Sequence, residues 1–75
     1  MVLAEVPTMV PFVVDALPDA SILRNKGITE GTPIMVFSRS SYGTMKVGIS
    51  DDTLASYSET FIGSTIAEQI QVTPL

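Results

Sequence analysis

The chain has 75 residues, of which 45% are hydrophobic and 16% charged, and it contains no Cys and no His. A chain of this length can build one modest core, and its stability has to come from packing, because it can form neither a disulfide nor a Cys or His metal site. Four basic residues against eight acidic ones give a net charge of −4. So few cations cannot neutralise a run of phosphates, which argues against a nucleic-acid partner.

The N-terminal residues do not have the pattern of a signal peptide, because no basic residue precedes the first apolar stretch and Glu5 interrupts it. The longest apolar runs, such as residues 34–37, are far shorter than the roughly 20 residues that cross a bilayer. We therefore expect a cytosolic protein with no membrane insertion.

The first expected strand covers residues 12–16, with Pro11 at its start, where a missing backbone donor is tolerated. A short helix of about two turns is expected over residues 18–26. Pro18 suits the first helical turn, and Asp19 places a carboxylate near the positive end of the helix dipole.

Gly27 is expected to end this helix, because a glycine there can take the left-handed conformation at little steric cost. The apolar Ile28 that follows can then fold back on Leu23. Residues 29–31 predict a tight turn, in which Gly31 supplies a second positive backbone angle.

Thr32 starts the second expected strand, which runs to Phe37. Its four consecutive apolar residues, 34–37, indicate a strand that is covered on both faces. A polar hairpin loop is expected at residues 38–43, followed by a third strand over 45–50 whose apolar and polar residues alternate.

A turn at residues 50–52 follows, and residues 53–61 show no clear pattern. Thr65 and Glu68 have the spacing of a capping box, which predicts one helical turn. Residues 70–72 are expected to form a final strand that closes a barrel. The pattern as a whole predicts a mainly β domain of about five strands, with one short helix after the first strand and a helical turn before the last.

Two glycines frame the most distinctive motif of the chain. Leu23 and Arg24 lead to a Gly-Ile-x-x-Gly-Thr sequence, whose fixed positions are Gly27, Ile28, Gly31 and Thr32, and an apolar strand follows. The chain also opens with Leu3-Ala4-Glu5 and closes with Ala67-Glu68-Gln69-Ile70-Gln71-Val72. In this order the sequence resembles the FeoA family, small barrels found beside the ferrous-iron transporter FeoB.

The resemblance has two departures. FeoA proteins commonly have a Pro-Gly turn soon after the opening Leu, whereas residues 7–11 contain no Gly, and the stretch over residues 50–61 is longer than the family norm. The first turn and the placement of the fourth strand are therefore the elements in which this chain is expected to differ from the family.

The resemblance implies a single FeoA-like domain over residues 1–75 with the fold of an SH3-like β-barrel. It also implies a small cytosolic accessory protein of ferrous-iron uptake, which docks on the cytoplasmic part of FeoB and modulates it. The alternative is a stand-alone SH3-like regulatory domain, related to those of metal-dependent transcription regulators. The acidic charge and the lack of an attached winged-helix unit argue against that alternative. The sequence leaves open whether the protein forms a weak homo-oligomer.

Catalysis is not expected, since the chain offers neither an imidazole base nor a thiolate nucleophile. No cofactor is expected either, because the glycines form no phosphate-binding pattern. Asp51 and Asp52 are the only adjacent carboxylates. They are either a weak site for a divalent transition-metal ion, as a ferrous-iron carrier would need, or turn formers.

Five side chains are candidates for contact with a partner. Arg24 and Lys26 either bind a partner or only interact favourably with the helix dipole. Tyr42, at the tip of the expected hairpin, either contacts a partner or folds back on the barrel. Met35 and Met45 lie either on an adaptable binding face or in the core.

Overall fold

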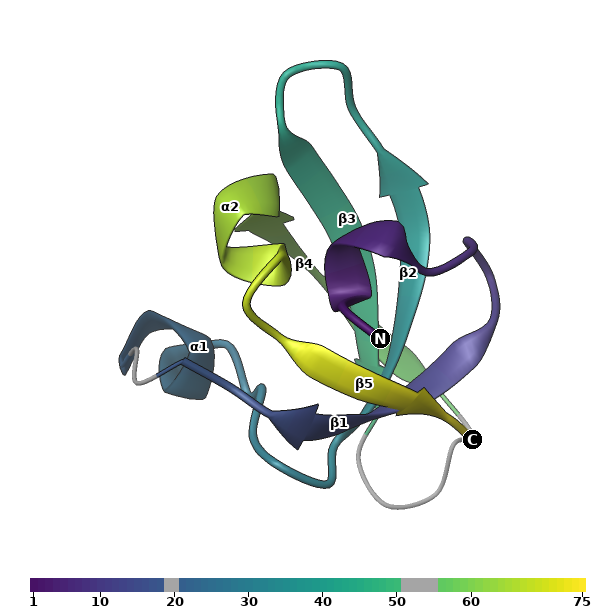
Figure 1. Ribbon diagram of the computed structural model, residues 1–75, viewed down its shortest axis with the longest axis vertical. Coiled ribbons are helices and arrows are strands. Elements are labelled where there is room, and N and C mark those ends of the chain that lie inside the picture. The colour runs from purple at the N-terminus through teal and green to yellow at the C-terminus, as the bar shows by residue number, and fades with distance from the viewer. Residues whose placement is uncertain (19–20, 51–55) are drawn as a thin grey trace.

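The described residues form five strands and two short α-helices, which follow one another in the order that the sequence predicts. Figure 1 shows how these elements are arranged. The structure is a computed structural model that describes residues 1–18, 21–50 and 56–75. In chain order, the elements are the 3-10 turn η1 (Leu3–Glu5), β1 (Pro11–Ala16), α1 (Ser21–Asn25), β2 (Pro33–Arg39), β3 (Thr44–Ser50), β4 (Tyr57–Gly63), α2 (Ser64–Ala67) and β5 (Gln71–Pro74). The mainly β, SH3-like fold is thereby confirmed.

The strands form one antiparallel sheet in the order β4-β3-β2-β1-β5. Bulges interrupt the ladder between Val36 and Ser38 and between Val14 and Ala16. Because a bulge bends its strand and increases the local twist, these two breaks help the sheet to curl around the core.

The final strand does not close a barrel by joining the fourth strand. β5 pairs with β1, and among the described residues no ladder links β5 to β4, so the sheet stays open with these two strands at its ends. The outer edge of β5 is covered by the N-terminus instead. The N–H of Val72 donates to the carbonyl of Met1 at 2.8 Å, and the N–H of Leu3 donates to that of Ile70 at 2.9 Å.

The helix end at Gly27 has the predicted geometry. Gly27 has a φ of +83° and donates to the carbonyl of Arg24, while the N–H of Ile28 donates to that of Leu23 at 2.9 Å. These two bonds form a Schellman motif, and its two apolar residues, Leu23 and Ile28, are both buried. α1 itself is shorter than the two turns expected over residues 18–26, and residues 19 and 20 lie outside the described part of the chain.

The second glycine of the motif makes the predicted turn as well, with a φ of +84°. The N–H of Gly31 donates to the carbonyl of Val14 at 2.8 Å, and the N–H of Val14 donates to the carbonyl of Thr32 at 3.0 Å. The turn is therefore fastened to β1, which places α1 beside one end of the sheet (Figure 1).

The core lies on the concave side of the sheet and draws residues from nearly every element. Its buried members are Leu3, Val6, Phe12, Val14, Leu23, Ile28, Ile34, Val36, Met45, Val47, Ile62, Ala67, Ile70 and Val72. The alternation expected for the third strand is confirmed over residues 45–47, where Met45 and Val47 are buried on either side of the half-exposed Lys46. It does not continue to the end of the strand, because Gly48 and Ser50 are buried and Ile49 is half-buried.

The N-terminal ten residues are more ordered than their mixed composition suggests. η1 places Leu3 in the core, and Val6 follows it there. The Arg39 guanidinium, from the end of β2, donates to the carbonyl of Ala4 at 3.2 Å and to the carbonyl of Val6. A cation that the sequence alone leaves without a role thus holds the N-terminal segment against the sheet.

The capping box expected at Thr65 and Glu68 does not form. α2 begins at Ser64, with Gly63 in place of Thr65 as its N-cap, and Glu68 is its C-cap. The reason is that β4 runs directly into the helix: the N–H of Ser64 donates to the carbonyl of Gly43 at 2.7 Å, so the sheet decides where the helix starts. Among the described residues, no helix has the length and apolarity needed to cross a membrane.

Candidate partner-binding surface

The convex side of β3 and β4 is the first surface with binding character. In their ladder, Lys46 stands opposite Phe61, and Gly48 stands opposite Glu59. Directly opposed residues share a face of the sheet, and the neighbouring Met45 points into the core. Lys46, Gly48, Glu59 and Phe61 therefore lie together on the outer side.

Two aromatic rings extend this side of the sheet. Phe37 and Tyr57 pack edge to face, with ring centroids 6.3 Å apart and an interplanar angle of 74°. The Phe37 ring lies over Gly48, because a Cβ built on Gly48 would stand 2.4 Å from Phe37 Cζ. The missing side chain at Gly48 is thus what gives the Phe37 ring room to pack against the sheet.

The remaining side chains make this surface amphipathic. Phe61 is 59% exposed, and Lys46 Nζ lies 2.7 Å from Glu59 Oε1. An open groove of about 560 Å³ runs along the surface and is lined by Met9, Phe37, Lys46, Tyr57 and Glu59. We call the set of Met9, Phe37, Lys46, Tyr57, Glu59 and Phe61 the outer face. One exposed and two half-buried aromatic rings with a Met around one ion pair are typical of a protein-binding surface.

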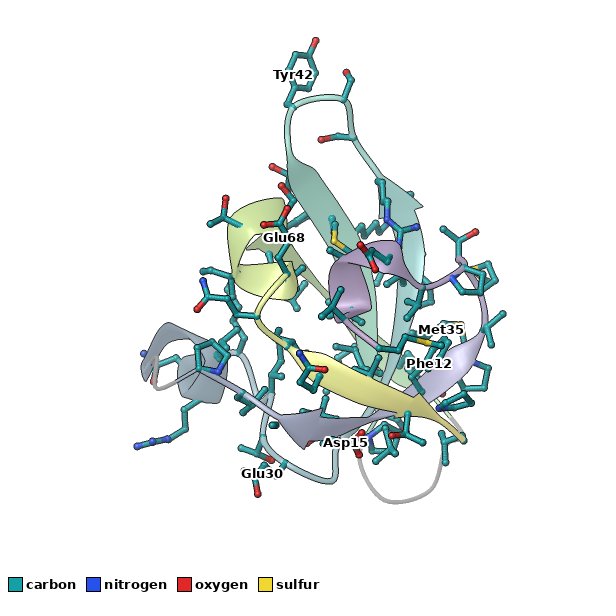
Figure 2. The ribbon with its side chains drawn as sticks, viewed as in Figure 1. Phe12, Asp15, Glu30, Met35, Tyr42 and Glu68 are labelled. Atoms are coloured by element: carbon teal, nitrogen blue, oxygen red, sulfur yellow. The ribbon has the colours of Figure 1, made fainter. Side chains whose placement is uncertain are left out.

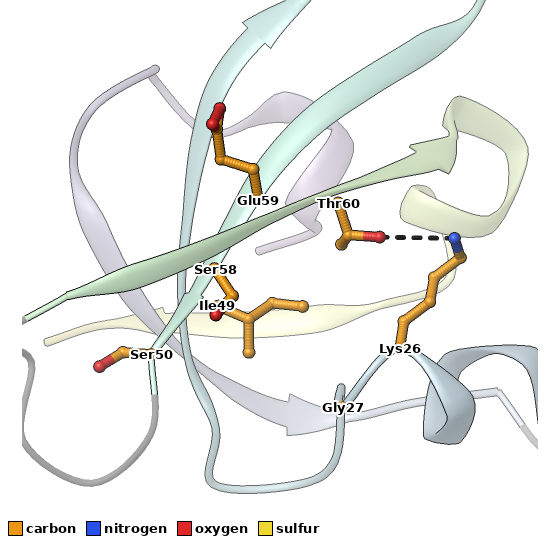
Figure 3. A pocket seen from close by; sticks show the side chains of 7 residues that line it. All are labelled: Lys26, Gly27, Ile49, Ser50, Ser58, Glu59 and Thr60. Atoms are coloured by element: carbon orange, nitrogen blue, oxygen red, sulfur yellow. Dashed lines mark hydrogen bonds between the residues drawn. The ribbon is translucent and has the colours of Figure 1, made fainter.

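A pocket lies beside β4, and we call it the edge pocket (Figure 3). It has a volume of about 410 Å³ and is lined by Lys26, Gly27, Ile49, Ser50, Ser58, Glu59 and Thr60. The half-buried Lys26 reaches across it, and its Nζ donates to Thr60 Oγ1 over 3.4 Å. The Gly27 turn positions this lysine, because the chain reverses directly after it.

The candidate residues from the sequence do not gather in one place. Arg24 is exposed on α1, and Lys26 lines the edge pocket. Tyr42 is 92% exposed at the tip of the β2–β3 hairpin and points away from the body of the molecule, so it does not fold back on the sheet (Figure 2). Met35 is half-buried and stands opposite Gly48, next to the outer face.

Met45 is a correction to the expected binding residues. It is only 2% exposed and packs in the core, because its register with Ile62 turns both side chains inward. Asp51 and Asp52, the candidate metal ligands, lie outside the described residues. Within the residues that are described, no three acidic side chains come together as a metal site.

Sequence reasoning did not find the outer face. Its aromatic members are Phe37, which the sequence predicts only as part of a covered strand, and Tyr57 and Phe61, which lie in a stretch without a clear sequence pattern. A signal was present, because Tyr57, Glu59 and Phe61 follow one another at the period of two that places side chains on one side of a strand. The residues between them are short and polar, so the strand lacks the regular apolar–polar alternation that would reveal this period.

The structure is similar to two solved structures over almost the whole chain. One is described as an iron uptake regulatory protein, FeoA; it has a TM-score of 0.78 and 22% identity, and the match covers 97% of this chain and 93% of that one. The other is a FeoA-like protein from Clostridium acetobutylicum, with a TM-score of 0.77 and 19% identity, over 100% of this chain and 86% of that one.

No protein-family model matches the chain, and no curated protein matches it in sequence. At these identities the two structures establish the fold. The FeoA-like fold that the glycine motif and the order of elements predict is therefore confirmed.

Proposed function

We propose that this chain is a small accessory protein of ferrous-iron uptake, which docks on the cytoplasmic part of a FeoB-like transporter and modulates its activity. The observation that carries the proposal is the FeoA-like fold over 97% of the chain, shared with a protein described as an iron uptake regulator. The fold alone does not determine a function, so the surface has to supply the rest of the argument.

The outer face supports a role in binding another protein. Phe61 is exposed and next to the Lys46–Glu59 ion pair, and the neighbouring groove is lined by Phe37 and Tyr57. A few anchor residues, often aromatic, contribute most of the binding energy in protein interfaces. Tyr42, at the hairpin tip, offers a second aromatic contact beyond the sheet.

The test is co-purification of FeoB with the tagged protein from detergent-solubilised membranes. We expect wild-type protein to recover FeoB and Phe61→Ser to recover about ten-fold less, which is the loss typical of an interface aromatic. Gln71→Ser, an exposed position in β5 at the other end of the sheet, is the matched control and should recover as much FeoB as wild type. Because Phe61 is 59% exposed, its replacement should leave the folded state intact.

Two results would contradict the proposal: repeated failure of the wild-type protein to recover FeoB, and ferrous-iron uptake that is unchanged when the gene is deleted. Recovery of a metal-dependent transcription regulator in place of FeoB would instead favour the regulatory alternative. Titration with ferrous iron under anaerobic conditions addresses a carrier role, which requires the amides of Asp51 and Asp52 to shift.

A further inference from the structure

The outer edges of the two end strands, β5 and β4, differ in their backbone hydrogen bonds. At the β5 end, the N-terminal segment supplies backbone partners, through the bonds of Met1 with Val72 and of Leu3 with Ile70. At the β4 end, the described residues form no ladder with the outer edge of the strand, since β4 pairs only with β3. An uncovered edge presents a row of backbone donors and acceptors that another strand can use.

β4 is also well shaped to receive such a strand. It is seven residues long, and it pairs with β3 from Tyr57 to Gly63 without a bulge. Natural edges are usually protected by a proline, a lysine or a bulge, and the sequence of β4 contains neither proline nor lysine. Its regular backbone therefore favours the addition of an extended peptide.

The edge pocket gives this edge a chemical preference. Lys26 Nζ contacts the neutral hydroxyl of Thr60 (Figure 3), and no acidic side chain of the described residues lies within ion-pair distance of it. The side chain of Glu59 lies on the opposite side of β4, where it pairs with Lys46. The lysine is half-buried beside the uncovered edge, and none of the described residues forms an ion pair with it.

We propose that the β4 edge binds an extended segment of a partner protein as an added strand, and that an Asp or Glu of this segment enters the edge pocket to pair with Lys26. Side chains of an added strand alternate between the two sides of the sheet, so those on the inner side lie over Ser58 and Thr60 and face the lysine. The inference rests on the proposed function only in that the chain acts by binding another protein.

A second copy of this chain is a poorer occupant of the edge. In an antiparallel pairing of two β4 strands, the inner side of the copy presents Ser58, Thr60 and Ile62, which carry no charge. Glu59, the only acid in β4, lies on the outer side with Lys46. The copy would therefore leave Lys26 without a carboxylate, and the net charge of −4 on each chain adds repulsion.

The test uses a short end-blocked peptide in which threonine and valine alternate around one central glutamate, with a lysine at each end for solubility. A matched peptide has glutamine at the centre, and a third is the glutamate peptide with all of its backbone amides N-methylated. Each is titrated into the labelled, full-length protein, and the amide shifts in NMR spectra give the site and the affinity.

We expect the glutamate peptide to shift the amides of Tyr57–Gly63 and to bind about three- to five-fold more tightly than the glutamine peptide, as a solvent-accessible ion pair would give. Lys26→Gln should remove this difference without weakening the glutamine peptide. Arg24→Gln removes the same charge from the exposed side of α1 and should keep the difference. The N-methylated peptide should not bind, because it has no backbone donor on either edge.

Equal affinities for the glutamate and glutamine peptides, or shifts that lie outside β4 and the edge pocket, would overturn the inference. So would concentration-dependent shifts of the β4 amides in the absence of peptide, since these would assign the edge to a second copy. If peptide binding fails while FeoB still co-purifies, only the edge inference is wrong; if FeoB fails to co-purify while the peptides bind as expected, only the proposed partner is wrong.

Discussion

Gly27 holds a backbone conformation that other L-residues adopt only with strain. Its φ is +83°, and no atom beyond the glycine and its two chain neighbours lies within 4 Å of the place where a Cβ would stand, so Gly27→Ala tests the backbone alone. We expect this change to lower the free energy of unfolding by about 1–2 kcal/mol, measured by urea denaturation, because the left-handed conformation brings the new Cβ close to a carbonyl oxygen.

Gly63→Ser is the control for this strain. Gly63 also has open space around its Cα, but its φ of −71° is ordinary, and it is the N-cap of α2, a position that favours Ser. Its stability should be unchanged or slightly higher than that of the wild type. A loss as large as that of Gly27→Ala would show that the cost does not arise from the left-handed backbone.

At the scale of the elements, the packing of β2, β3 and β4 depends on the gap at Gly48. A Cβ there would lie 2.4 Å from Phe37 Cζ and 2.9 Å from Tyr57 Cβ, both closer than normal contact. We expect Gly48→Ala to lower the free energy of unfolding by about 1–3 kcal/mol, as overpacking commonly does, because the aromatic pair has to move away from the sheet.

The same substitution in a Phe37→Leu background separates this clash from other effects of the new methyl group. The shorter side chain removes the ring atoms nearest to Gly48, so Gly48→Ala should cost clearly less there than in the wild type. Equal costs in the two backgrounds, again from urea denaturation, would mean that the Phe37 ring does not press on the glycine.

At the scale of the whole molecule, the N-terminal segment joins the two ends of the chain. Leu3 is fully buried, and its N–H donates to the carbonyl of Ile70 at 2.9 Å. We expect Leu3→Ala to lower the free energy of unfolding by about 2–4 kcal/mol, the usual cost of truncating a buried Leu. For a chain of this size, that is a large part of the total stability.

Leu75→Ala removes the same atoms near the other end of the chain and is the matched control. Leu75 is 60% exposed, so its truncation should change the free energy of unfolding by less than about 0.5 kcal/mol. If Leu3→Ala had an equally small effect, the N-terminal segment would not be part of the folding unit.

Much of the local structure could be predicted from the sequence, because it depends on residues that are close in the chain. The helix end at Gly27, the turn at Gly31 and the alternation in β3 each follow from the conformational freedom of a glycine or from the period of a strand. The start of α2 could not be predicted in this way, since it depends on a bond between Ser64 and Gly43.

The candidate site was predictable only in part. Tyr42 and Lys26 could be singled out as a loop-tip aromatic and a cation at a helix end, but the side on which a strand residue lies depends on its register. That register buries Met45 and exposes Phe61 on the outer face. The uncovered edge of β4 could not be foreseen either, because it results from the order of the strands.

By itself, then, the sequence determined a mainly β chain without His or Cys, its glycine-bounded helix end and turn, and the order of its elements, since these follow from composition and short-range backbone chemistry. Tertiary structure alone decided that the N-terminus covers β5, that β4 remains an edge, and that Lys26 lies beside it. The physical reason is that strand pairing brings together residues far apart in the chain, and local preferences do not specify which pairs form.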